Sequence, residues 1–241
     1  MICTLDNGIR LEQDKKGFGY GIDAIVLSYF ARAKKGDLVV DLGTGNAVVP
    51  LLMEHCHKGS SFIGIEIQTE AVDNALKSVE LNNRQDKVKV LQCNIKDSVS
   101  TLGYNLADVV VSNPPYFAVK SGSANYRDSL SFARHEVLCT LEDVIRNALG
   151  ILKCNGVFYM VHRPDRLQEI FVLSQKYKAR VKRIRLVYPS SDSNANIVLV
   201  EIRPNARQGL IIEPPLIVYD KESRYTQSME DIRTVMLKNK S

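Results

Sequence analysis

The sequence contains no tryptophan, only 7% aromatic residues and no long apolar run. A membrane helix needs roughly 20 consecutive apolar residues, so no membrane span is expected. The N-terminus lacks a basic segment followed by an apolar one, so no secretory signal is expected. The five cysteines are odd in number and none forms a CxxC pair, which argues against a disulfide framework and a zinc ribbon. We therefore expect a cytoplasmic protein without a metal.

The remaining composition is that of an ordinary folded domain. Of the 241 residues, 45% are hydrophobic and 24% charged, with 32 basic and 27 acidic side chains. The net charge of +5 is compatible with a polyanionic partner without requiring one. No repeat or linker divides the chain, so we expect a single domain over 1–241. It would comprise a short helical extension (about 10–35), a core (about 36–225) and a tail (about 226–241), in which residues 231–238 are compatible with a terminal helix. The sequence sets no oligomeric state and is compatible with a monomer.

Strand-like and helix-like segments alternate along the core. Helical periodicity begins at Ile22, Ile25 and Val26, and Thr140 with Asp143 resembles a capping box that opens a helix. Short apolar runs predict seven strands, at 38–41, 62–67, 88–93, 108–112, 157–161, 183–188 and 197–202. This alternation predicts an α/β fold with a doubly wound, mostly parallel sheet that ends in an antiparallel strand. In such sheets a ligand lies beyond the carboxyl ends of the strands.

A glycine-rich turn follows the first core strand. Asp41, Gly43 and Gly45 form an acid-x-Gly-x-Gly pattern, and Glu66 ends the next strand 21 residues after Gly45. This spacing is typical of a carboxylate that binds ribose hydroxyls, so the pair indicates an adenosine-containing cofactor. Val48 stands where a dinucleotide fingerprint needs a third glycine, and no Gly-Lys-Ser/Thr follows, which argues against a P-loop. The alternative is a tight turn without a ligand.

The third strand ends at Asn94, whose side-chain carbonyl can accept a hydrogen bond from the amino group of an adenine. The fourth strand ends in Asn113-Pro114-Pro115-Tyr116-Phe117. The prolines stiffen this loop, which leaves the Asn113 amide oxygen and the Pro114 carbonyl as two fixed acceptors for one –NH₂ group. Two such acceptors favour a tetrahedral nitrogen and aim its lone pair at an electrophilic methyl group. Tyr116 can stack on a base.

These motifs resemble those of class I S-adenosylmethionine-dependent methyltransferases that act on adenine N6, cytosine N4 or a glutamine amide. The motif alone does not choose among these substrates. Only 40 residues precede Asp41, too few for the helical domain of glutamine methyltransferases. No Pro-Cys loop is present, which argues against cytosine-C5 methylation.

Further segments of the sequence narrow the resemblance to one family of methyltransferases. The runs Ala133–Glu136, Val161–Leu167 and Glu213–Tyr219 are similar to the bacterial valine-tRNA adenine-N6 methyltransferases, over about residues 10–225. The resemblance implies a Rossmann-like class I fold and methylation of adenine 37 in tRNA. A glutamine methyltransferase acting on a protein and an rRNA base-amine methyltransferase stay open as alternatives. By the same resemblance, S-adenosyl-L-methionine would be held by Asp23, Asp41, Gly43, Gly45, Glu66, Ile67, Asn94 and Asn113, and the target adenine by Asn113, Pro114, Pro115 and Tyr116.

A tRNA partner has weaker independent support. Six cations occur within ten residues, between Lys176 and Arg185, with no acid among them. Each phosphate that such a stretch neutralises adds salt-dependent affinity. The expected RNA-binding residues are Phe117, Lys176, Lys178, Arg180, Lys182 and Arg183. The alternative is an ordinary solvated basic face.

Overall fold

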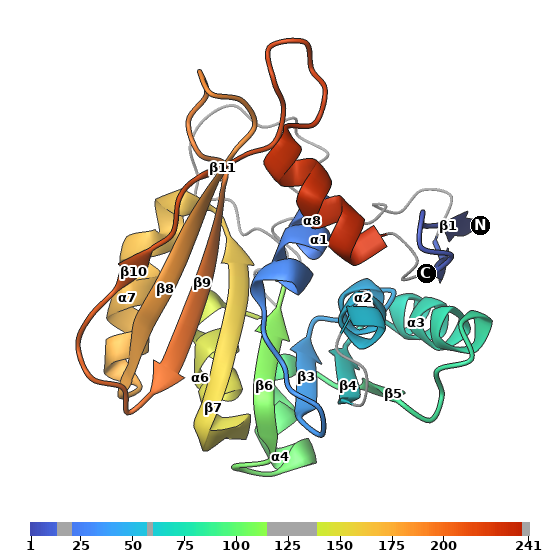
Figure 1. Cartoon of the computed structure of the whole chain (residues 1–241). Coiled ribbons are helices and arrows are strands. Elements are labelled where there is room, and N and C mark those ends of the chain that lie inside the picture. Colours follow the sequence, from blue (N-terminus) through green and yellow to red (C-terminus); the bar gives the residue numbers. More distant parts are fainter. Residues whose placement is uncertain (14–20, 57–59, 115–138, 238–241) are drawn as a thin grey trace, which may run out of the picture.

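The computed structural model describes residues 1–13, 21–56, 60–114 and 139–237, and its centre is a mostly parallel β-sheet (Figure 1). The sheet has nine strands in the order β10-β8-β9-β7-β6-β3-β4-β5, with β11 also paired to β8. The seven longer strands are β3 (Leu38–Leu42), β4 (Ser61–Glu66), β5 (Val88–Gln92), β6 (Ala107–Ser112), β7 (Leu152–His162), β8 (Ala179–Tyr188) and β9 (Ile197–Pro204). The expected doubly wound α/β fold is confirmed.

The strand count differs from the expectation at one edge. β9 runs antiparallel to both of its neighbours, β7 and β8. Two additional strands of two residues each, β10 (Ile211–Ile212) and β11 (Leu216–Ile217), pair in parallel with β8. Such short strands carry no periodicity in the sequence, and their pairing depends on the strand beside them.

Helices cover both faces of the sheet (Figure 1). One apolar core lies against α1 (Ile22–Phe30), α2 (Val48–Cys56), α3 (Thr69–Leu81) and α8 (Gln227–Leu237). The other lies against α4 (Ser98–Leu102), α6 (Leu141–Ile151) and α7 (Leu167–Lys176), with the 3₁₀ turns η1 (Ile95–Asp97) and η2 (Pro164–Arg166). The capping box of α6 is present, because the Thr140 hydroxyl accepts from Asp143 N at 3.1 Å and the Asp143 carboxylate accepts from Thr140 N at 3.0 Å. No helix in the described ranges is both long and apolar enough to cross a bilayer.

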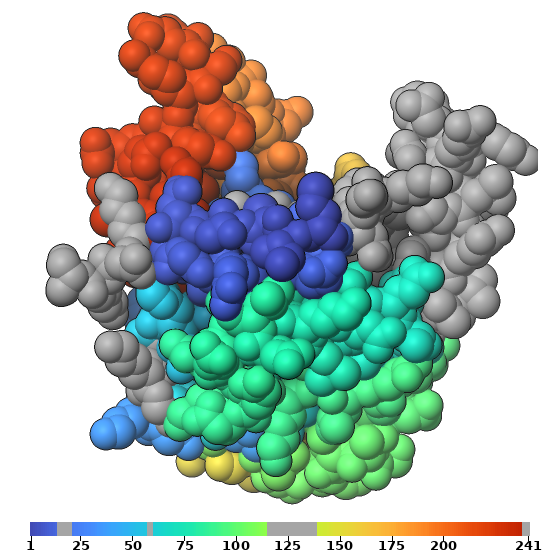
Figure 2. Space-filling model, turned by 90° about the vertical axis from the view of Figure 1, so that its right-hand side faces the viewer, coloured from blue at the N-terminus to red at the C-terminus, as the bar shows by residue number. Residues whose placement is uncertain are grey.

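Both ends of the chain pack against the helices of the core. Residues 1–13 form an antiparallel hairpin of β1 (Ile2–Thr4) and β2 (Arg10–Glu12), which lies over α3 in Figure 2. Ser78 and Asn82 of α3 hold it, since Glu12 N donates to Ser78 Oγ at 2.9 Å and Arg10 N to Asn82 Oδ1 at 3.0 Å. At the other end, α8 buries Met229, Ile232, Met236 and Leu237 against the core.

A buried ion pair joins the antiparallel edge of the sheet to α1. Arg183 on β8 contacts Glu201 of β9 and Glu213 after β10, each at 2.7 Å. Its guanidinium also donates to Phe30 O at 3.0 Å and lies 3.8 Å from the centre of the Phe30 ring. The side chains of Arg183 and Glu201 are 9% and 7% exposed, so each charge depends on the other. Arg203 binds the second oxygen of Glu201 at 2.7 Å from a more exposed position.

We expect Arg183→Met to lower the free energy of unfolding by roughly 3–5 kcal/mol, because it leaves the buried Glu201 with only the more exposed Arg203 and removes the partner of Glu213. Arg203→Met is the matched control: Glu201 keeps Arg183, so the loss should stay below about 1 kcal/mol. Urea unfolding of the three proteins measures both values. Equal losses in the two variants would contradict a central role for Arg183.

Candidate functional site at the carboxyl edge of the sheet

Three neighbouring strands deliver the conspicuous motifs to one edge of the sheet. β3 pairs in parallel with both β4 and β6, so the loops after Leu42, Glu66 and Ser112 leave the same edge. The Ser112 hydroxyl donates to Leu42 O at 2.7 Å and joins the ends of β6 and β3. Gly43 N and Thr44 N both donate to Ile65 O, at 2.8 and 2.9 Å. The expected convergence of the motifs is therefore present in the fold.

The glycine loop leaves open space on its outer side. Gly43 and Gly45 have φ of +80° and +54°, which glycine adopts without strain. A Cβ on Gly45 would meet nothing within 4 Å, and one on Gly43 would meet only Ile95 Cδ1, at 3.9 Å. The loop backbone can therefore be approached closely by a ligand.

Two residues that support this loop were not identified from the sequence. A Cβ on Gly64 of β4 would lie 2.7 Å from Thr44 Cγ2, so only glycine lets Thr44 pack against that strand. A glycine inside a strand commonly marks such a close approach, and this was the available signal. Thr44 is buried, which fixes the middle of the loop between its two glycines.

Glu66 holds the loops after β3 and β4 together. One carboxylate oxygen accepts from Gly45 N at 3.1 Å, and the other accepts from Ile67 N and Gln68 N at 2.8 and 3.0 Å. The residue is buried. A carboxylate has about four acceptor positions, so one remains after these three bonds. Glu66 can thus position the glycine loop and still accept a bond from a hydroxyl group.

Asp41 is a buried carboxylate at the end of β3. Its oxygens have no hydrogen-bond partner within 3.5 Å among the described residues, and it is 2% exposed. Burial raises its pKa to about 7; the nearby Thr44 hydroxyl opposes this rise and the charge of Glu66 adds to it. A buried carboxyl group with unused acceptor positions favours a ligand that brings a donor or a positive charge.

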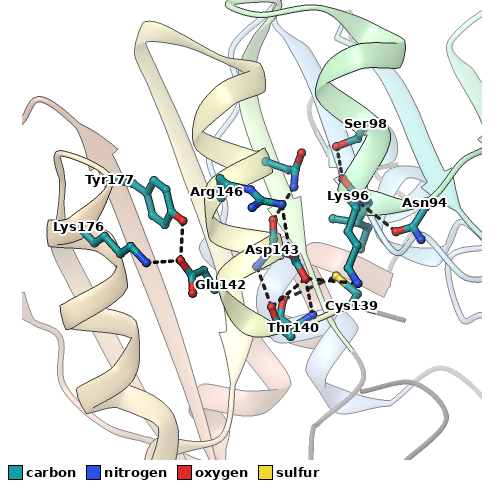
Figure 3. Close-up of polar contacts among 12 residues, drawn as sticks. Asn94, Lys96, Ser98, Cys139, Thr140, Glu142, Asp143, Arg146, Lys176 and Tyr177 are labelled. Atoms are coloured by element: carbon teal, nitrogen blue, oxygen red, sulfur yellow. Dashed lines mark hydrogen bonds and ion pairs between the residues drawn. The ribbon is translucent and has the colours of Figure 1, made fainter. Parts of the chain in front are cut away.

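Two more of the expected cofactor residues, Ile67 and Asn94, follow β4 and β5, which end at the same edge of the sheet. Asn94 caps η1, because its Oδ1 accepts from Lys96 N at 3.0 Å (Figure 3). An amide oxygen can accept a second bond, so one acceptor position remains. Ile67 contributes its backbone N–H to Glu66. Asp23 lies half-buried in the first turn of α1.

The amine-binding motif is described only in part. Asn113 is half-buried and Pro114 is buried, directly after the end of β6. Pro115, Tyr116 and Phe117 lie outside the described residues. Asn113 and Pro114 therefore lie at the edge where Ser112 joins the glycine loop of β3.

A polar network connects η1 to the start of α6 (Figure 3). Asp143 contacts Arg146 at 2.8 Å and Lys96 at 3.8 Å. Burial alone would raise the pKa of Asp143, but hydrogen bonds from Thr140 and these two cations outweigh it and lower the pKa. Burial, with the charge of Asp143, raises the pKa of the adjacent Cys139 thiol to about 12, so this cysteine is not a nucleophile at neutral pH.

His162, at the end of β7, was also not identified from the sequence. It is fully buried, and its Nδ1 accepts from Arg163 N at 2.8 Å. Burial, assisted by the charge of Arg166, lowers its pKa to about 4, so the imidazole is neutral at physiological pH. A polar residue that ends a central apolar strand was the signal for it.

Two of the expected RNA-binding cations are engaged within the fold. Arg183 is the buried partner of Glu201 and Glu213, so its charge is neutralised within the fold. Lys176 contacts Glu142 of α6 at 2.5 Å, and Tyr177 shares that carboxylate at 2.6 Å (Figure 3). Lys176 therefore connects two helices rather than standing alone on the surface.

Three more of these cations, Lys178, Arg180 and Lys182, lie away from the converging loops. Ala179, which begins β8, pairs with Pro204, which ends the antiparallel β9. β8 thus runs in the direction of β6, and Lys178 and Arg180 lie at the amino edge, opposite Asn113. Lys182, farther along β8, donates to Arg207 O at 3.0 Å. The structure does not bring these cations to the site.

The described residues contain no group of three or more His, Cys, Asp or Glu side chains that could hold a metal ion. The polar atoms at the carboxyl edge are instead two carboxylates, two amides and the backbone of a glycine loop, which are groups that bind an organic ligand.

Residues 21–179 match the family described as methyltransferase small domain. The chain belongs to this family. The resemblance to methyltransferases is thereby confirmed, and the protein is a methyltransferase whose glycine loop and Asn113-Pro114 segment lie inside the matched region.

The methyltransferase is also similar to individual curated proteins. One from Dyadobacter fermentans is 24% identical over 213 residues, which cover 88% of this chain and 87% of the relative. One from Pectobacterium carotovorum is 24% identical and covers 91% of this chain and 87% of the relative. Both relatives are named tRNA1(Val) (adenine(37)-N6)-methyltransferase.

Solved structures share the fold of the methyltransferase. A predicted O-methyltransferase from Agrobacterium tumefaciens superposes with a TM-score of 0.71 at 21% identity, covering 90% of this chain and 97% of that one. P. horikoshii TYW2, solved in complex with MeSAdo, gives a TM-score of 0.58 at 15% identity, covering 83% of this chain and 70% of that one. The Rossmann-like class I methyltransferase fold is thus confirmed.

The raised pKa of Asp41 predicts a particular pH dependence of stability. Between pH 4 and about 7 the folded protein holds a proton that the unfolded chain has released, so the free energy of unfolding falls as the pH rises through this window. Asp41→Asn should remove this fall and stabilise the free protein at pH 8, by at most about 4 kcal/mol. Urea unfolding at pH 4.5 and pH 8 measures it.

Asp108 provides a control, because its pKa is shifted in the opposite direction to that of Asp41. Burial would raise its pKa, but hydrogen bonds from Leu38 N and Lys153, with the charge of Lys153, lower it. Asp108→Asn should therefore cost stability at pH 8 and little near pH 3. A stability profile for Asp41→Asn that stays parallel to that of the wild type would contradict the raised pKa.

Proposed function

We propose that this methyltransferase transfers the methyl group of S-adenosyl-L-methionine to N6 of adenine 37, next to the anticodon of a valine tRNA. The observation that carries the proposal is the meeting of Asn113 and Pro114 with the glycine loop at one sheet edge, through the Ser112–Leu42 bond. The names of the Dyadobacter and Pectobacterium relatives support the choice of tRNA and of adenine N6.

The residues at this edge fit the cofactor. The open side of Gly43 and Gly45 admits the methionine portion, and the unused acceptor position of Glu66 suits a ribose hydroxyl. The buried Asp41 carboxyl group, with no partner among the described residues, suits the positive end of the molecule. Asn94 keeps one acceptor position, which suits the amino group of the adenine. When bound, S-adenosyl-L-methionine supplies an electrophilic methyl group.

The chain's own contribution is to orient the nucleophile. The Asn113 amide oxygen and the Pro114 carbonyl accept the two hydrogens of the adenine –NH₂ and favour a tetrahedral nitrogen. The lone pair, otherwise conjugated with the ring, then points toward the methyl group. The methylated nitrogen releases its proton to water, so no general base is required. The target adenine must be unstacked, as bases in an anticodon loop can be.

The direct test is transfer of radiolabel from S-adenosyl-L-methionine to total bacterial RNA, followed by digestion and identification of the labelled nucleoside. We expect N6-methyladenosine in the tRNA fraction, and in valine tRNA when isoacceptors are separated. Label in rRNA, or in protein with none in RNA, would contradict the proposal and favour an rRNA base-amine or a glutamine methyltransferase.

Two substitutions should separate chemistry from cofactor binding. Asn113→Ala removes one acceptor of the amine, so we expect kcat to fall roughly 100- to 1000-fold with the cofactor Kd nearly unchanged. Glu66→Ala removes the acceptor of three backbone N–H groups, so the cofactor Kd should rise roughly 10- to 100-fold. Calorimetric titration and single-turnover assays measure the two effects. Normal turnover by Asn113→Ala would refute the amine-binding role.

A further inference from the structure

A cavity of about 370 Å³ is lined by residues of α1, α8 and β8. Its wall includes Tyr29, Arg32, Arg183, Arg185 and Glu213. We call this cavity the arginine cleft. Tyr29 is 41% exposed and Arg32 is exposed as well. The cleft contains none of the residues assigned to the cofactor or to the amine.

The charge of the arginine cleft is not balanced. Arg183 is paired with Glu213 and Glu201 and serves as its buried floor. Among the described residues, no carboxylate lies within 4.0 Å of Arg32 or Arg185; Arg185 donates from Nε to Pro214 O at 3.1 Å. Three cations against one carboxylate thus line the cleft. Two guanidinium groups without acidic partners favour an anionic ligand.

Within the arginine cleft, Arg185 lies level with the amine-binding motif along the strands. Arg185 pairs with Leu199, and Leu199 pairs with Val161 of β7. This row is one residue beyond the row in which Met160 pairs with Ser112, and so is level with Asn113. Three strand spacings separate β8 from β6, which is about 14 Å. That distance corresponds to a few nucleotides of a polynucleotide that passes over the sheet edge.

We propose that the arginine cleft binds the phosphate backbone of the RNA a few nucleotides from the methylated base. Arg32 and Arg185 hold the phosphates, and Tyr29 offers an exposed ring on which a base can stack. Arg183, already neutralised, fixes the wall through Glu213 and the Phe30 carbonyl. This assignment rests on the proposed RNA substrate. It places the RNA backbone away from Lys178 and Arg180, which lie at the amino end of β8.

The test is the double variant Arg32→Gln/Arg185→Gln, which removes two charges and keeps polar side chains. We expect its Kd for a fluorescent, unmodified valine tRNA to rise roughly 10- to 100-fold. The slope of log K against log salt should fall by about 0.7 for each phosphate that the variant no longer neutralises. The KM for tRNA should rise in parallel, while kcat at saturating tRNA and the cofactor Kd keep their wild-type values.

Lys77→Gln/Lys89→Gln is the matched control, because it removes two exposed charges from α3 and β5, at the opposite end of the sheet. It should bind tRNA as the wild type does. The inference is overturned if wild-type protein binds tRNA and the Arg32/Arg185 variant keeps its Kd and salt slope, or if the weaker binding appears in Lys178→Gln/Arg180→Gln instead. If the wild type neither binds nor methylates tRNA, the proposed function fails and this inference fails with it.

Discussion

The architecture of the site depends on the Glu66 carboxylate, which accepts backbone N–H groups from two different loops. Parallel strands by themselves bring only strand ends together, and the loops beyond them remain free to diverge. The bond from Gly45 to one oxygen and the bonds from Ile67 and Gln68 to the other remove this freedom. Two glycines in left-handed conformations make the short turn between Asp41 and α2 possible, and they leave space for a ligand. A single side chain therefore determines both the shape of the loop and one of its binding groups.

The sequence predicted the parts of the molecule whose signals are local. The central strands are apolar runs that end at glycine or a polar residue, and β3, β4, β5 and β6 lie within a residue or two of their expected bounds. The capping box of α6 needs only Thr140 and Asp143, three residues apart. The spacing between Gly45 and Glu66 indicated a ribose-binding carboxylate, but it did not predict the bond from Gly45 N to Glu66 that the structure contains. The roles of Asn113 and Glu66 toward substrate and cofactor remain predictions.

The features that the sequence did not predict depend on residues that lie far apart in the chain. Arg183 stands in a run of cations, and nothing local reveals that Glu201 and Glu213 neutralise it from 18 and 30 residues away. The hairpin of β1 and β2 has strands of three residues, and its position depends on Ser78 and Asn82 of α3. The pKa of Asp41 results from burial, which only the folded chain provides. In each case the deciding neighbour lies far along the chain.

The packing of α8 against α1 also affects how the protein folds during its synthesis. The Asn7 side chain donates to Met236 O at 2.9 Å, across 229 residues, so the hairpin of residues 1–13 meets α8 beside α2. A ribosome that adds about 5–20 residues per second needs on the order of 10–40 seconds to extend from α1 to α8. Until then α1 lacks one of its packing partners, and its apolar residues are open to chaperones. The enzyme therefore completes this part of its fold only after α8 has been synthesised, although its glycine loop is made early.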